Sequence, residues 1–223
     1  MLLRLAIAPV IVILFYIYFR DKYEKEPLIL LFTGIFFGVV ISFPIIFFEN
    51  FIDGFSPSGG NAEAFFNSFC VASFTEEFFK FLVLFFLIGR NKNFNEPYDG
   101  IAYSVFISLG FAGFENVLYV FNPNTGGLET AVLRAVLSVP GHALFAVFMG
   151  YYFSIAKFIR EKRAVMLILA FLIPFILHGT YDFILLADIP LYFIPFSLFI
   201  VFLWVGGFIK IKKHLKDSPF KKN

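Results

Sequence analysis

Long apolar stretches are the feature of this sequence that most limits its possible folds. Each is close to the roughly twenty residues that an α-helix needs to cross a bilayer, and short turn-rich or charged segments separate them. Hydrophobic residues make up 60% of the chain, whereas soluble domains are roughly 45–50% apolar. The sequence therefore predicts an all-α, polytopic membrane helix bundle with about seven transmembrane helices, at residues 2–19, 28–48, 64–88, 100–121, 130–156, 164–186 and 191–209.

The basic residues predict how the bundle is oriented. Fifteen of the eighteen Lys and Arg residues follow the first, third, fifth and seventh stretches. The other connections, at residues 52–63, 122–129 and 187–190, carry none. Because basic loops stay in the cytoplasm, we expect a multi-pass protein of the cell membrane with its N-terminus outside and its C-terminus cytoplasmic. Residues 1–211 would form a single transmembrane domain, and residues 212–223 a basic cytoplasmic tail.

Composition also argues against several classes of partner and site. The formal net charge is only +2, and no basic face with interleaved aromatic residues is evident outside the tail, so we expect the lipid bilayer and no nucleic acid as a partner. The single cysteine, Cys70, excludes an internal disulfide and a cysteine-rich metal site. A role for this chain must therefore be sought among its carboxylates and histidines.

Three charged residues interrupt the third apolar stretch. Glu76, Glu77 and Lys80 are spaced three and four residues apart, so their heads can meet on one side of a helix. A charged side chain at the centre of a bilayer costs roughly 2.5–3.5 kcal/mol on insertion scales. Such groups persist where they face a protein interior or a water-filled cavity and pair with one another. Two adjacent carboxylates exceed what one structural ion pair requires.

Other stretches also carry polar residues, the histidines at a depth similar to that of Glu76 and Glu77, and Glu115 and Asp182 somewhat toward the outer side. Glu115 and Asn116 lie in the fourth stretch, His142 in the fifth, and His178 and Asp182 in the sixth. His178 and Asp182 are four residues apart, so the carboxylate can orient the imidazole on the same helix face. Two histidines and several carboxylates on four helices are the groups that activation of water requires. We expect them to line one cavity, entered from the outer leaflet.

Each of these residues also has a structural interpretation. Either histidine could make a simple interhelical hydrogen bond, and Lys80 could merely neutralise one glutamate. Intramembrane acids and histidines also form proton relays, so a proton-coupled or ion transporter is an alternative function, as is a non-catalytic membrane scaffold. The sequence contains neither the H-E-x-x-H motif of zinc metalloproteases nor the G-x-S-x-G motif of serine hydrolases.

Taken in order, these motifs resemble the PrsW family of intramembrane proteases, which belongs with the CAAX prenyl endopeptidases and bacteriocin-immunity-type membrane proteases. The likeness runs from about Asp21 to Asp182, and the acidic segment 21–27 after the first stretch shares it. Each of four motifs lies in a separate stretch: Glu76-Glu77-Phe78-Phe79-Lys80, Gly113-Phe114-Glu115-Asn116-Val117-Leu118-Tyr119, Pro140-Gly141-His142 and His178-Gly179-Thr180-Tyr181-Asp182.

The resemblance implies an intramembrane peptidase that cleaves a membrane-bound protein. Its expected substrate is a single-pass membrane protein, such as an anti-sigma factor cut at its first cleavage site. By the same resemblance Glu76 would activate water with Glu77 as its partner, and His142 and His178 would polarise the carbonyl and stabilise its oxyanion. Glu115 would complete the catalytic cluster, and supporting roles would fall to Lys80, Asn116 and Asp182, the last of which would orient His178.

A metal ion is a further possibility that the resemblance leaves open. Two histidines and a glutamate can ligate zinc, so His142, His178 and either Glu76 or Glu77 would be the ligands. Related proteases, in contrast, are described as acting through glutamate without a metal. The prediction is therefore a glutamate- or metal-dependent hydrolase with zinc as the possible cofactor.

Overall fold

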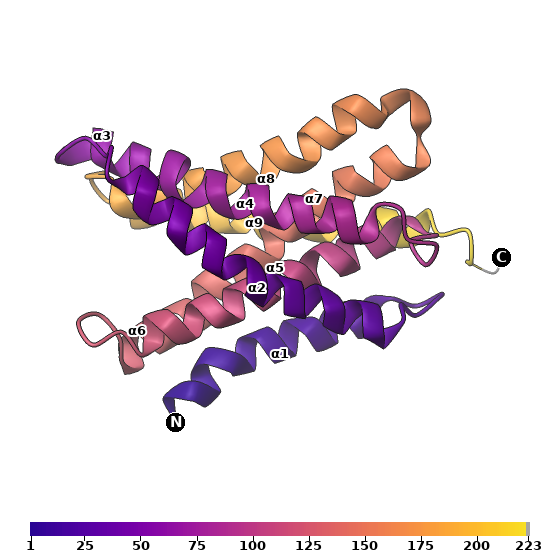
Figure 1. The fold of residues 1–223 in the computed structure, drawn as a ribbon, viewed down its shortest axis with the longest axis horizontal. Coiled ribbons are helices and arrows are strands. Elements are labelled where there is room, and N and C mark those ends of the chain that lie inside the picture. Colours follow the sequence, from indigo (N-terminus) through magenta and orange to yellow (C-terminus); the bar gives the residue numbers. More distant parts are fainter. Residues whose placement is uncertain (222–223) are drawn as a thin grey trace.

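A computed structural model describes residues 1–221, and all regular elements of that part of the chain are helices (Figure 1). Six helical segments are long and apolar enough to cross a membrane, which confirms a polytopic helical membrane protein. In chain order the elements are α1 (Leu2–Arg20), α2 (Leu28–Asp53), α3 (Gly60–Phe65), η1 (Phe66–Ser73), α4 (Phe74–Val83), η2 (Leu84–Ile88), α5 (Pro97–Val120), α6 (Leu128–Leu133), η3 (Arg134–Ser138), α7 (Val139–Phe158), η4 (Arg160–Lys162), α8 (Arg163–Leu186) and α9 (Phe193–Lys216).

The third predicted stretch is the segment that differs from these six. Elements α3, η1, α4 and η2 follow one another without a break, and together they run the length of the bundle (Figure 1). Every window of eighteen residues within them contains Glu76 and Glu77 together with Glu63 or Lys80, so each holds at least three charged residues, whereas the apolar windows of the six hold at most two. The N-terminus and the end of α9 lie at opposite ends of the bundle (Figure 1), as an odd number of crossings requires. Seven crossings and an outer N-terminus stay predictions.

π-Helical turns precede two of the helices that carry the polar residues, α4 and α7. Element η1 leads directly into α4, and η3 leads directly into α7. A π-turn inserts an extra residue into the helical repeat, so it rotates every later side chain relative to the earlier ones. Such turns are rare in proteins overall, but many of those that occur lie at functional sites. Here they set the direction of the polar side chains on α4 and α7.

Helix α5 forms the centre of the bundle and packs against α1, α2 and α7. Its contact with α7 is close because glycines face each other: a Cβ atom on Gly150 would overlap the backbone carbonyl of Gly100. The hydroxyl of Ser154, one turn further along α7, donates to the carbonyl of Pro97 at 2.7 Å. These contacts fix α7 against the buried helix and so position the residues that α7 carries.

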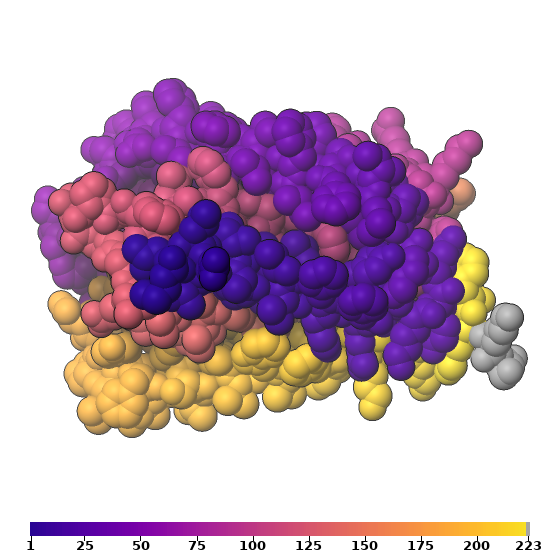
Figure 2. Space-filling view, turned by 90° about the horizontal axis from the view of Figure 1, so that it is seen from below, coloured from indigo at the N-terminus to yellow at the C-terminus, as the bar shows by residue number. Residues whose placement is uncertain are grey.

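The outer surface of the bundle is strongly apolar. Helix α1 lies on this surface (Figure 2), where Val12 is 65% and Phe15 58% exposed, and Phe86 of η2 is 76% exposed. Contiguous apolar surface of this kind is unusual on soluble monomers. Bilayer lipid satisfies such side chains, because it is as apolar as they are.

Residues near the C-terminus pack against the bundle. Helix α9 continues to Lys216, beyond residue 211 where the sequence predicted the domain to end, and His214 and Leu215 are buried. The hydroxyl of Ser218 donates to Glu96, the N-cap residue of α5. The part of the predicted tail at 222–223 lies outside the described residues.

Two more carboxyl groups are buried at this end of the molecule, between α1 and α2. Asp21 and Glu26 are 2% and 3% exposed, and Tyr103 donates its hydroxyl to Glu26. Burial, followed by repulsion from Glu96, raises the pKa of Asp21 from 3.8 to about 8. Burial likewise raises the pKa of Glu26 from 4.5 to about 7. Both carboxyls therefore hold protons over a pH range in which they would be ionised in an unfolded chain.

Candidate active site

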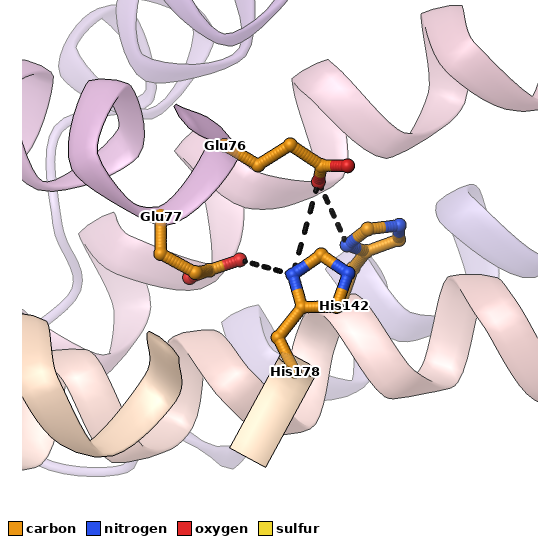
Figure 3. Close-up of side chains that lie close together, drawn as sticks. All are labelled: Glu76, Glu77, His142 and His178. Atoms are coloured by element: carbon orange, nitrogen blue, oxygen red, sulfur yellow. Dashed lines mark hydrogen bonds and ion pairs between the residues drawn. The ribbon is translucent and has the colours of Figure 1, made fainter. Parts of the chain in front are cut away.

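Four predicted site residues meet in the interior of the bundle (Figure 3). Glu76 and Glu77 come from α4, His142 from α7 and His178 from α8. One donor atom from each lies within 4.8 Å of the others, and none of the four residues is more than 5% exposed. The structure thus brings together side chains that are up to about a hundred residues apart in sequence.

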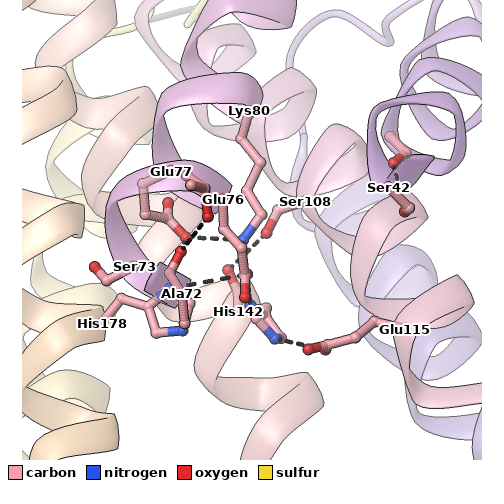
Figure 4. Close-up of polar contacts among 12 residues, drawn as sticks. Ser42, Ala72, Ser73, Glu76, Glu77, Lys80, Ser108, Glu115, His142 and His178 are labelled. Atoms are coloured by element: carbon pink, nitrogen blue, oxygen red, sulfur yellow. Dashed lines mark hydrogen bonds and ion pairs between the residues drawn. The ribbon is translucent and has the colours of Figure 1, made fainter. Parts of the chain in front are cut away.

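Lys80 lies among these groups and is 1% exposed. Its Nζ donates to Glu76 Oε2 at 2.9 Å and to Glu77 Oε1 at 2.8 Å (Figure 4). This confirms that the spacing of the three residues places their heads on one side of the helix. The same ammonium lies 3.4 Å from His142 Nδ1 and 4.4 Å from the ring centre of Phe111. It is the positive charge nearest to the two buried glutamates.

His142 is held in place through both its ring and its backbone. Its Nε2 lies 3.2 Å from Glu115 Oε2, and its backbone carbonyl accepts a hydrogen bond from Ser108 at 3.0 Å. Because the Lys80 ammonium can only donate, the neighbouring Nδ1 of His142 must accept. The proton of a neutral His142 is therefore on Nε2, and its Nδ1 lone pair faces the glutamates of α4.

His178 has a carboxylate at each ring nitrogen. Its Nε2 lies 3.2 Å from Asp182 Oδ2, as their four-residue spacing predicted, and its Nδ1 lies 3.1 Å from Glu77 Oε1. The ring stacks on Phe145 with centroids 4.9 Å apart. Two carboxylates can both accept hydrogen bonds only from a doubly protonated imidazole, so this pair of contacts favours the imidazolium when no metal is bound.

Arg134 belongs to this site, although the sequence analysis did not select it. Its Nη2 donates to Glu115 Oε2 at 2.5 Å, its Nε donates to Asn116 Oδ1 at 2.8 Å, and its guanidinium lies 4.0 Å from the ring centre of Tyr119. Asn116 also donates to the carbonyl of Ala6 at 2.8 Å. The signal was present in the sequence, because Arg134 is itself a charged residue within a predicted membrane stretch.

A cavity of about 740 Å³ gives access to the centre. Glu76, His142 and His178 line it, and Glu115 and Asp182 do so as well, whereas Glu77 and Lys80 lie behind them. The cavity extends to the end of the bundle where the connections carry no basic residues, since its lining also includes Asp53, Asn67 and Asn122.

The cavity wall contains a second residue that the sequence analysis missed, Glu49 of α2. The predicted stretch ended at residue 48, so Glu49 was assigned to a connection. Helix α2 continues to Asp53, and the extra turn keeps Glu49 within the bundle and turned toward the cavity.

The chemistry of this centre fits a metal ion. Glu76 and Glu77 offer carboxylate oxygens, and His142 and His178 offer their Nδ1 atoms. Histidines that bind metals usually donate their other N–H to a carboxylate, and here Glu115 and Asp182 occupy those positions. Imidazole and carboxylate donors in this number can hold a divalent metal ion.

Comparison with known proteins agrees with this geometry. A bundle of membrane-spanning helices with a buried glutamate and histidine centre beside a polar cavity is the arrangement that a membrane-embedded hydrolase requires. The profile described as "PrsW family intramembrane metalloprotease" matches residues 26–206. The chain belongs to the PrsW family and is a multi-pass membrane peptidase, which confirms the resemblance seen in its motifs.

Relatives similar to this chain extend over nearly its whole length. A protein named "Protease PrsW" from Geobacillus kaustophilus is 42% identical over 95% of this chain and 91% of its own. Proteins of the same name from Clostridioides difficile and Bacillus subtilis are 39% and 41% identical, over 97% and 93% of this chain and 92% of each relative. No solved structure matches the chain.

Proposed function

We propose that this protein hydrolyses a peptide bond of a membrane-bound protein with a water molecule that the glutamates and histidines activate. The observation that carries the proposal is the convergence of Glu76, His142 and His178 on one wall of the cavity. The carboxylate of Glu76 and the two imidazole rings thus lie on the same wall of a cavity that water and a peptide can reach. Membership in a protease family favours this function over the transporter and scaffold alternatives.

Glu76 is the base that takes a proton from water. It lines the cavity, whereas Glu77 is only 1% exposed and lies behind it, bound by Lys80 and His178. Glu77 therefore acts by holding Lys80 and His178 in place. A proton acceptor must be within hydrogen-bond reach of the water that it activates, and only Glu76 of the two meets that requirement.

The rings of His142 and His178 line the cavity and would stabilise the negative charge that develops on the carbonyl oxygen electrostatically, because their N–H groups are already donated to carboxylates. Asp182 fixes the ring of His178, and Glu115, itself held by Arg134, fixes the ring of His142. When a metal is bound, His142 Nδ1, His178 Nδ1 and one of the two glutamates would hold it, and it would supply Lewis-acid polarisation of the carbonyl.

The substrate that this arrangement suits is a single-pass membrane protein, such as an anti-sigma factor or a similar signalling protein. The cavity reaches the end of the bundle whose connections lack Lys and Arg, which the positive-inside rule assigns to the outer face of the cell membrane. Cleavage would therefore occur near the outer leaflet, in a chain with seven crossings and a cytoplasmic C-terminus.

The test is cleavage by purified protein in liposomes that contain candidate single-pass substrates, with products identified by mass spectrometry. Glu76→Gln keeps the shape of the side chain but removes the base, so its rate should fall at least about a hundredfold. The matched control is Glu161→Gln, an exposed residue of η4, which should cleave at the wild-type rate. A folded Glu76→Gln variant with full activity would exclude the proposed mechanism.

A further inference from the structure

The ammonium group of Lys80 lies where a metal ion would compete for the same ligands. Its Nζ is 2.9 Å from Glu76, 2.8 Å from Glu77 and 3.4 Å from His142 Nδ1 (Figure 4). Three of the four residues that could hold a metal are therefore already in contact with one cation. The fourth, His178, is bound to Glu77 and Asp182.

We infer that Lys80 is an internal counter-cation that competes with a divalent metal ion for the two glutamates and His142. The ammonium neutralises the carboxylates when no metal is present. When a metal binds, the ammonium either moves away from the carboxylates or stays there and repels the metal. This inference rests on the metal-dependent form of the proposed function. It assigns to Lys80 the control of metal affinity.

Electrostatics gives the direction of the effect. Carboxylate oxygens lie about 2.0–2.2 Å from a bound zinc ion, so an ammonium within hydrogen-bond distance of the same oxygens would lie only a few ångströms from the metal. Lys80 is 1% exposed, and like charges repel strongly where water does not screen them. Loss of the ammonium should therefore strengthen metal binding.

A purely structural role for Lys80 predicts the opposite. If the lysine only holds the glutamates in position for a metal, its removal would let the carboxylates turn away and would weaken metal binding. Lysine has a flexible four-carbon chain and a compact charge, so its ammonium can shift relative to the glutamates more readily than α4 itself. The sign of the change in affinity separates the two roles.

The experiment measures zinc affinity by competition with a zinc-binding dye, with wild type, Lys80→Met and Lys80→Arg purified in detergent. Lys80→Met should bind zinc at least tenfold more tightly than wild type, and Lys80→Arg should stay close to wild type because it keeps the charge. Unchanged or weaker binding by Lys80→Met would overturn the inference, as would the absence of zinc binding in all three proteins.

Removal of Lys80 leaves two buried glutamates without their counter-cation, and this could prevent folding. A second pair of variants avoids that problem, because Glu77→Gln removes one negative charge. Glu77→Gln/Lys80→Met should bind zinc at least tenfold more tightly than Glu77→Gln alone, and equal affinities would contradict competition. Since zinc binding is measured without substrate, a chain that binds zinc as expected but cleaves nothing would refute the proposed function and not this inference.

Discussion

Arg134 should stabilise the protein through Glu115, and its replacement by methionine is the clearest structural perturbation of the site. Methionine keeps the length of the side chain but removes the charge. Arg134→Met would abolish the 2.5 Å contact with Glu115, the 2.8 Å hydrogen bond to Asn116 and the stacking on Tyr119. Glu115 would then remain in the bundle with His142 as its one hydrogen-bond partner among residues 1–221.

The size of the effect follows from how far these groups are buried. Breaking a fully buried ion pair by removing one partner costs about 3–5 kcal/mol. The side chains of Arg134 and Glu115 are 14% and 17% exposed, so some water can reach both. We therefore expect Arg134→Met to lower the free energy of unfolding by about 2–3 kcal/mol. Glu115→Gln should have a smaller effect, about 1–2 kcal/mol, because the amide can still accept from Arg134.

A double-mutant cycle in mixed detergent micelles, with unfolding by sodium dodecyl sulfate followed by circular dichroism, measures the coupling directly. Once Glu115 is neutral, loss of Arg134 leaves no unpaired charge. The double variant Glu115→Gln/Arg134→Met should therefore be more stable than the sum of the two single effects predicts, by at least about 1 kcal/mol. Additive effects would show that Arg134 and Glu115 are not coupled. They would contradict the claim that Arg134 holds Glu115 in place beside His142.

Three further predictions concern different parts of the molecule. Asp182→Asn should reduce cleavage by about 10–100-fold with little change in thermal unfolding, because it weakens only the orientation of His178; an unchanged rate would remove Asp182 from the site. Gly150→Leu should fail to accumulate in the membrane fraction, since its side chain would overlap the carbonyl of Gly100. Because the folded protein raises the pKa of Asp21 to about 8, the stability that protonated Asp21 contributes is complete below about pH 4 and is lost as the pH rises to about 8. The midpoint of thermal unfolding should fall from about pH 6 to about pH 9, and Asp21→Asn should flatten that fall; a midpoint that rises over this range would contradict the assignment.

Contacts within one helix could be predicted from spacing alone. Residues three or four apart share a helix face, and the contacts of Lys80 with Glu76 and Glu77 and of His178 with Asp182 are as the spacing requires. Hydropathy predicted the membrane helices for a similar reason, because the thickness of the bilayer fixes the length of an apolar segment.

Contacts between helices could not be derived from spacing. The meeting of Glu115 with Arg134 depends on the rotation of α5 relative to η3, and the π-turns of η3 change that rotation in a way that no local pattern predicts. Glu49 was missed because hydropathy locates the end of a helix only to within several residues. The acids at 21 and 26 were seen as one segment, but their burial results from tertiary packing against α5.

The central claim is that residues of separate helices act on one water molecule, and cleavage by a double variant tests it most directly. Single-turnover rates would be measured in liposomes for Glu76→Gln, His178→Gln and the two combined. Residues that act as one unit show strongly non-additive losses, so the double variant should cleave within about threefold of the slower single variant. A double variant whose loss equals the product of the two single losses would mean that Glu76 and His178 act independently, and it would contradict the shared centre.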